Sequence, residues 1–124
     1  MKILFIRPNM TNTRSSDAME PLAFAVLSGL TPPDVEQVFL DERLEPIDET
    51  LSADLVALSV ETFTARRAYE LAEGFRKRGI PVVMGGYHPT LLPEEALEHA
   101  DAVAVGDAED LWPQIVEDAR KGKL

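Results

Sequence analysis

The sequence predicts an α/β domain in which helices cover both faces of a five-stranded parallel sheet. Two observations carry this prediction. Five short apolar runs recur along the 124 residues, and several are apolar at every position, as in strands that are buried on both faces. Helical patterns separate these runs, so right-handed crossovers would join the strands in the order 2-1-3-4-5, a doubly wound, three-layer arrangement of the flavodoxin-like or Rossmann-like kind.

The expected strands are rich in valine, isoleucine or leucine. They span residues 3–6, 35–40, 55–60, 82–84 and 102–105. Between the first two lies a helix over 20–30, which ends at Thr31-Pro32-Pro33 because proline cannot continue it. The polar connection 41–54, between the second and third strands, is expected to hold no more than a helical turn.

Three further helices follow the third strand. The clearest covers 64–78, with Thr62 or Thr64 as its N-cap, and ends at Gly79. Its apolar face consists of Ala65, Ala68, Leu71, Ala72 and Phe75. Pro93 opens a short helix, and the last helix runs over 109–121 with acidic residues at its start and basic residues at its end.

Length and composition indicate a single domain, because 124 residues with 45% hydrophobic content suffice for one core and not for two. No apolar run reaches the roughly 18 residues that cross a bilayer, and no signal peptide is evident, so a cytoplasmic location without membrane contact is expected. The absence of cysteine excludes disulfides, a thiol nucleophile and cysteine-bound metal within these residues. A net charge of -10 argues against nucleic acid as a partner.

Ligands of such sheets bind outside the carboxyl ends of the strands, where the winding reverses between the first and third strands. Four loops meet at that edge, namely 7–17, 61–64, 85–92 and 106–109. The first of them, RPNMTNTRSSD, is longer than a connection to the next helix requires. Its length points to a ligand or a partner as much as to a plain surface loop.

Two features at this edge have the composition of a binding site. Ser59 places a small hydroxyl inside an apolar strand, where it needs a hydrogen-bond partner, either a backbone carbonyl or a ligand. Gly85 and Gly86 end the fourth strand and leave two positions of bare backbone. A tight turn would explain one glycine better than two, so close approach of a ligand is favoured over a torsion that only glycine adopts.

The chain has two histidines, His88 just after the glycines and His99. Without cysteine or a His-Glu-x-x-His spacing they do not predict a metal site. His88 is more simply a loop histidine bonded to nearby backbone, and His99 lies where the end of a short helix favours it. No nucleophile and base pair accompanies the acids at this edge, so no catalytic residue is predicted. These acids are Glu61, Asp107, Glu109 and Asp110.

Four segments, taken in order, resemble the N-terminal cobalamin-binding domain of cobalamin-dependent radical S-adenosylmethionine enzymes. They are MKILFIRPN, DLVALSVET, IPVVMGGYHPTLLPEEAL and DAVAVGDAEDLWPQIVED, and together they span nearly the whole chain. The specific part is the order and spacing of Asp54-Leu55-Val56, Gly85-Gly86-x-His88-Pro89-Thr90, Pro93-Glu94-Glu95 and Gly106-x-x-Glu109. In cobalamin domains a serine after the third strand and a glycine pair after the fourth line the pocket for the cofactor's nucleotide tail, and Ser59 and Gly85-Gly86 match those positions.

The resemblance implies that residues 1–124 form the N-terminal, cobalamin-binding part of a longer enzyme. A radical S-adenosylmethionine domain of the same chain, with an iron–sulfur cluster, would then perform methyl transfer or related radical chemistry, and this part alone would bind without catalysing. The segment 121–124 would begin the linker to it. The residues expected at the cofactor are Asn9, Thr11, Ser59, Glu61, Thr62, Gly85, Gly86, His88, Gly106 and Glu109.

Two positions depart from related patterns. Cobalamin-dependent mutases and methionine synthase carry Asp-x-His-x-x-Gly after the first strand, and this histidine binds cobalt from below, whereas the loop 7–17 has no histidine. The resemblance therefore implies cobalamin bound with its tail removed from cobalt and no histidine from that loop in its place. Asp107 stands where many relatives have glutamate, which is a mild change.

The main alternative is a flavodoxin-like electron carrier that binds FMN. The phosphate would be held by Thr11, Thr13, Ser15 and Ser16. However, this loop lacks the glycine of such a phosphate site, and no aromatic residue is placed to sandwich the flavin. A signalling receiver domain is nearly excluded, because Arg7-Pro8, Glu61 and Gly106-Asp107 stand where its acids, phosphoacceptor aspartate and lysine belong.

If the tail of cobalamin lies against the two glycines, Gly86→Leu abolishes cobalamin binding. His88→Ala leaves binding largely intact, because this histidine follows the fourth strand and not the first. Corrin absorbance retained after mixing with hydroxocobalamin and desalting measures both effects, and the opposite ranking would overturn the assignment.

Overall fold

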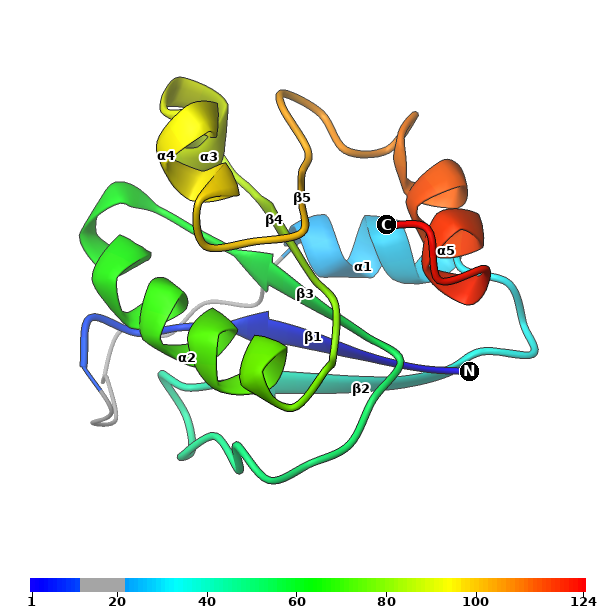
Figure 1. Cartoon of the computed structure of the whole chain (residues 1–124), viewed down its shortest axis with the longest axis horizontal. Coiled ribbons are helices and arrows are strands. Elements are labelled where there is room, and N and C mark those ends of the chain that lie inside the picture. Colours follow the sequence, from blue (N-terminus) through cyan, green and yellow to red (C-terminus); the bar gives the residue numbers. More distant parts are fainter. Residues whose placement is uncertain (12–21) are drawn as a thin grey trace.

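A computed structural model, which describes residues 1–11 and 22–124, contains one parallel sheet in the order β2-β1-β3-β4-β5. The strands are β1 (Lys2–Arg7), β2 (Glu36–Asp41), β3 (Leu55–Ser59), β4 (Val82–Gly85) and β5 (Ala102–Val103). Figure 1 shows them side by side with helices in front of and behind them. The predicted fold class and strand order are confirmed.

The strands in the middle of the sheet are buried on both faces, as their continuous apolar runs predicted. In β1 every residue from Ile3 to Ile6 is fully buried. At the edges the pattern weakens, since β2 is partly exposed along its length. The pairing of β5 ends at Val103, two residues earlier than expected, and Val105 is 51% exposed.

Alternate residues of the strands build two hydrophobic clusters, one on each face of the sheet. One face is covered by α2 (Ala65–Lys77) and α4 (Pro93–Leu97), and the other by α1 (Leu22–Gly29) and α5 (Trp112–Arg120). In Figure 1, α2 lies in front of the sheet and α1 lies behind it. None of the helices in the described ranges is long and apolar enough to span a bilayer.

The helices follow the predicted pattern with shifted ends. The apolar face of α2 is buried at all five predicted positions, and Gly79 ends the turn after it with a φ of 79°. Helix α5 begins at Trp112 and not at residue 109, because residues 108–111 form a turn and Pro113 stands at the start of the helix. For α1 the first expected residues, 20 and 21, lie outside the described part of the chain.

The segment 85–92 is not a loop, which corrects the sequence-based expectation. After Gly86 the chain enters the short helix α3 (Tyr87–Leu91), and α4 follows almost directly. The 3-10 turn η1 (Thr62–Thr64) similarly occupies the connection from β3 to α2. Both connections are therefore ordered by backbone hydrogen bonds, among them Leu92 N–H to His88 O at 2.8 Å.

The two glycines after β4 differ in what surrounds them. Gly86 has a φ of 109°, and a Cβ built on it would lie 2.7 Å from the carbonyl oxygen of Val60. Gly85 has no such torsion, and its Cβ would lie 3.7 Å from the Cβ of Ala104, an ordinary contact. The protein's own backbone thus requires glycine at position 86, whereas position 85 has room for a methyl group.

Replacing Gly86 with alanine should lower the free energy of unfolding by more than about 2 kcal/mol, because the methyl group meets the Val60 backbone and the torsion is strained. The matched variant Gly85→Ala should stay within about 1 kcal/mol of the parent protein. Urea unfolding followed by circular dichroism measures both. Equal stability of the two variants would contradict the close backbone approach.

Candidate functional site

Ser59 and Gly85 are neighbours across β3 and β4, at the carboxyl end of the sheet. Side chains alternate along a strand, so both lie on the face that carries Ala57 and Val83 and is covered by α1 and α5. On these two strands, nothing larger than serine stands at this end of the face. In the described part of the chain the Ser59 hydroxyl has no hydrogen-bond partner, so the backbone carbonyl considered as its partner does not bind it.

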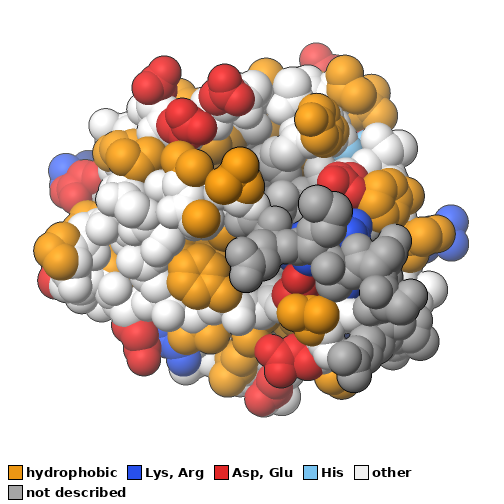
Figure 2. Space-filling view, turned by 180° about the vertical axis from the view of Figure 1, so that it is seen from behind, with side chains coloured by type: hydrophobic (Ala, Val, Ile, Leu, Met, Phe, Trp, Pro, Cys, Tyr) orange, Lys and Arg blue, Asp and Glu red, His pale blue; other side chains and the backbone are white. Residues whose placement is uncertain are grey.

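The two helices on this face, α1 and α5, are joined by hydrogen bonds between the end of α1 and the start of α5. Trp112, which is 1% exposed, donates its indole N–H to the Thr31 hydroxyl at 2.9 Å, and that hydroxyl donates to the Leu27 carbonyl at 2.7 Å. The rings of Trp112 and Phe24 both pack on Phe5 of β1. Figure 2 shows the molecule from behind, the side on which α1 lies, where apolar side chains gather. These contacts thus fix α1 and α5 to each other and to β1.

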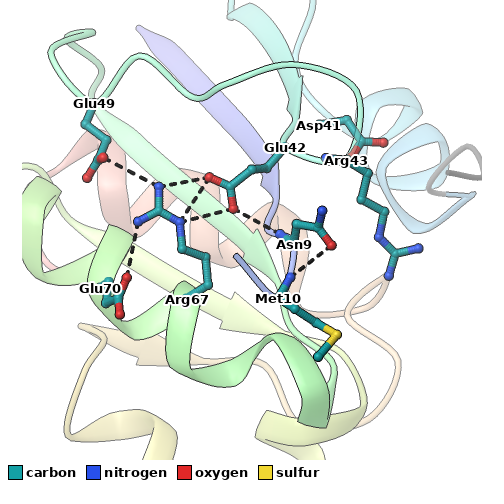
Figure 3. Close-up of polar contacts among 8 residues, drawn as sticks. All are labelled: Asn9, Met10, Asp41, Glu42, Arg43, Glu49, Arg67 and Glu70. Atoms are coloured by element: carbon teal, nitrogen blue, oxygen red, sulfur yellow. Dashed lines mark hydrogen bonds and ion pairs between the residues drawn. The ribbon is translucent and has the colours of Figure 1, made fainter. Parts of the chain in front are cut away.

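The loop after β1 is held to the opposite layer by a buried carboxylate. Glu42 is 1% exposed and accepts the backbone N–H of Asn9 at 3.1 Å. The same carboxylate accepts from the guanidinium of Arg67 on α2, at 2.8 Å for the shortest contact, and this raises the pKa of Arg67 (Figure 3). Thr11 follows on the exposed part of this loop.

His88 lies away from the Ser59–Gly85 face. Its side chain is 6% exposed, with Nδ1 3.3 Å from the Thr62 hydroxyl and Nε2 3.1 Å from the Tyr69 hydroxyl. Nε2 also contacts the carboxylate of Glu95 on α4. These partners are side chains and not the nearby backbone that was expected, because α3 turns the ring toward α2.

An open hollow of about 410 Å³ adjoins this histidine, between α2 and α4. There His99 stacks on Tyr69 with ring centroids 4.0 Å apart, so the ring of Tyr69 holds His99 in addition to any effect of the helix end. In the described residues no group of three potential ligands is placed to hold a metal ion.

The remaining predicted residues surround the edge of the sheet without meeting at one point. Glu61 approaches Arg43 at 3.5 Å and is half exposed. The Gly106 N–H donates to the Thr90 hydroxyl at 3.0 Å, and Glu109 is exposed in the turn before α5. The structure therefore brings Ser59 and Gly85 together, and it places Thr62 and His88 together on the other face.

Two residues at this edge, Glu42 and Arg67, were not predicted from the sequence. Arg67 falls off the apolar face of α2, which normally predicts exposure, but its side chain is only 12% exposed because it reaches Glu42. Glu42 stands in a polar connection with nothing in the local pattern to mark it. A useful signal is its place directly after β2, since every residue after a parallel strand reaches the same edge.

A doubly wound parallel sheet that brings a serine and a glycine together at the carboxyl ends of two neighbouring strands is typical of ligand-binding α/β domains. Residues 20–116 match the model of the B12 binding domain family, and the chain belongs to that family. The resemblance to cobalamin-binding domains is thereby confirmed. Nothing in this match supports the FMN alternative, three of whose residues, Thr13, Ser15 and Ser16, lie outside the described part of the chain.

Two curated relatives are methyltransferases of Chlorobaculum tepidum. The bacteriochlorophyllide d C-8(2)-methyltransferase is 41% identical over 104 residues, which are 83% of this chain and 23% of the relative. The bacteriochlorophyllide d C-12(1)-methyltransferase is 30% identical over 128 residues, which cover 99% of this chain and 28% of the relative. The chain spans about a quarter of the length of these relatives.

The contacts of Glu95 with Tyr69 and His88 are expected to make the thermal stability of the domain fall at acidic pH. The hydroxyl of Tyr69 and then the ring of His88 hold the pKa of Glu95 below its ordinary value of 4.5. A lowered carboxyl pKa stabilises the fold above the unfolded value, and this stability is lost as the pH falls through the folded value. Glu95→Gln should therefore flatten the fall of the thermal midpoint below about pH 5.

The matched control is Glu94→Gln, which removes an exposed acid from the same helix turn. It should leave the wild-type pH dependence in place. Parallel curves for the wild-type protein and Glu95→Gln, measured by thermal unfolding from neutral to acidic pH, would show that the Tyr69–Glu95–His88 contacts do not form.

Proposed function

We propose that this domain binds cobalamin and presents it to a radical S-adenosylmethionine catalytic domain for methyl transfer or related radical chemistry. The observation that carries the proposal is the hydroxyl of Ser59, which has no hydrogen-bond partner among residues 1–11 and 22–124, beside the backbone of Gly85 in a chain of the B12 binding domain family. The residues fit the cofactor, because a long polar tail needs a stretch of backbone without bulky side chains to lie against and a hydrogen-bond partner beside it.

The nucleotide tail would lie along the α1 and α5 face, against Gly85 and within reach of the Ser59 hydroxyl. Asn9 and Thr11 from the first loop, and Gly106 and Glu109 from the last, would border the corrin at the carboxyl edge. Gly86 contributes by holding β4 against Val60 and not by touching the cofactor. When bound, cobalamin supplies a cobalt centre that takes up and releases a methyl group, and the residues of this chain bind and orient it.

The chain would hold cobalamin in the histidine-off form. Both histidines of the sequence, His88 and His99, lie on the side of the sheet covered by α2 and α4. Both ring nitrogens of His88 already have side-chain neighbours in hydrogen-bonding distance, among them Thr62 and Tyr69. Neither histidine therefore reaches cobalt from the Ser59–Gly85 side, and Thr62 and His88 support the site through α3 and do not line it.

The partner would be the rest of a longer polypeptide in which residues 1–124 form the N-terminal domain. Large apolar side chains stand exposed after each strand at the carboxyl edge, where a second domain would cover the corrin. They are Met10, Leu44, Phe63, Tyr87, Leu91 and Val105. The relatives, which are methyltransferases, have about three quarters of their length beyond the matched part, room for a catalytic domain with an iron–sulfur cluster and S-adenosylmethionine. A cytoplasmic location stays a prediction of the sequence.

Wild-type protein mixed with hydroxocobalamin and desalted should retain corrin absorbance, whereas Gly85→Leu should bind at least about tenfold more weakly, because its side chain would occupy the place beside Ser59 that the proposal gives to the nucleotide tail. Position 85 is a sharper probe than position 86, since its backbone torsion tolerates a side chain.

The control Gly29→Leu adds the same side chain at an exposed position with open space around it, near the end of α1. It should bind cobalamin like the wild-type protein. Loss of the corrin colour in folded wild-type protein, or equal binding by Gly85→Leu and Gly29→Leu, would rule out this site.

A further inference from the structure

We infer that Glu42 is a positioning residue, whose carboxylate fixes the point at which the loop after β1 leaves the sheet for the cofactor. The inference rests on the proposed function, because that loop is the one expected to border the corrin. Its physical basis is one buried carboxylate that accepts both from Arg67 of α2 and from the backbone of Asn9 (Figure 3).

The charge of Glu42 is fully removed from water, so its hydrogen bonds must replace hydration. The side chain is 0% exposed. Nε of Arg67 donates to Oε1 at 3.1 Å and to Oε2 at 3.0 Å, and Nη2 donates to Oε2 at 2.8 Å. These three contacts fix the orientation of the carboxylate relative to α2, so that Oε1 points to the loop after β1.

The loop is tied at two successive amides. Oε1 of Glu42 accepts the Asn9 N–H at 3.1 Å, and Oδ1 of Asn9 accepts the Met10 N–H at 2.9 Å. The backbone N–H of Glu42 itself donates to the Arg7 carbonyl at 3.0 Å. Glu42 is thus hydrogen-bonded to the residues on both sides of Pro8. Met10, which follows, is 61% exposed at the carboxyl edge.

Neutralising Arg67 does not by itself require Glu42. Two other carboxylates approach the same guanidinium, Glu70 at 3.3 Å and Glu49 at 3.5 Å, and both remain near solvent with side chains 58% and 47% exposed. Among the residues of this network, Glu42 is the one that also contacts the loop. The contact with Asn9 is therefore a separate role from the ion pair.

Two double variants separate these roles. Glu42→Met with Arg67→Met replaces the buried ion pair by apolar side chains, an exchange that folds generally tolerate, and removes the acceptor for Asn9. Glu42→Gln with Arg67→Met also lacks the ion pair but keeps a carbonyl acceptor at position 42. Glu70→Met is the control, because it takes a carboxylate from Arg67 without touching the loop.

Two readouts are used, hydrogen exchange of the Asn9 and Met10 amides without cofactor, and the dissociation constant for hydroxocobalamin. In Glu42→Met/Arg67→Met we expect exchange at least about tenfold faster and binding about tenfold weaker. Glu42→Gln/Arg67→Met should recover most of both, and Glu70→Met should match the wild-type protein.

Equal behaviour of the two double variants, or an Asn9 amide that stays protected in both, would overturn the role of Glu42, because a purely structural ion pair is missing from both alike. If the wild-type protein itself binds no cobalamin, the proposed function fails, and the exchange of the Asn9 amide still decides whether Glu42 positions the loop.

Discussion

The contact between the backbones of Gly86 and Val60 is the constraint on which the rest of the structure depends. The ladder between β3 and β4 continues past both strands, with Val60 N–H donating to Gly85 O at 2.8 Å and His88 N–H donating to Val60 O at 3.2 Å. There is no room for a Cβ between them. This approach keeps Ser59 beside Gly85 on one face, and it sends the chain into α3, which carries His88 to the other face.

Charge is arranged around the same edge. The chain has 22 acidic and 12 basic residues, yet three arginines pair with carboxylates where β1, β2 and β3 end. Arg7 pairs with Asp41, Arg43 with Glu61, and Arg67 with Glu42. Each pair joins segments far apart in the sequence, so electrostatic contacts hold the loops that would surround a cofactor.

Local patterns predicted most of the fold, because strands that are buried on both faces are apolar at successive positions and are easily recognised in a sequence. Short apolar runs, several of them continuous, identified all five strands, and the helical period identified the buried face of α2. The same rules failed at Arg67, whose place on α2 predicts exposure, and at segment 85–92, whose short helix has no period long enough to detect. A carboxylate 25 residues away determines the burial of Arg67, and no local pattern contains it.

The sequence by itself determined the parallel sheet, its order, and the presence of a serine and two glycines at the carboxyl edge, since these depend on residue type and position along the chain. Only the tertiary structure decided what each of them does. Gly86 meets the backbone of Val60, Gly85 pairs with Ser59 and has room for a methyl group, and His88 turns to Tyr69 and Glu95. The reason is physical: a glycine in a sequence can mark a close backbone approach or a position that would accept a side chain, and the distance to the neighbouring strand decides between the two.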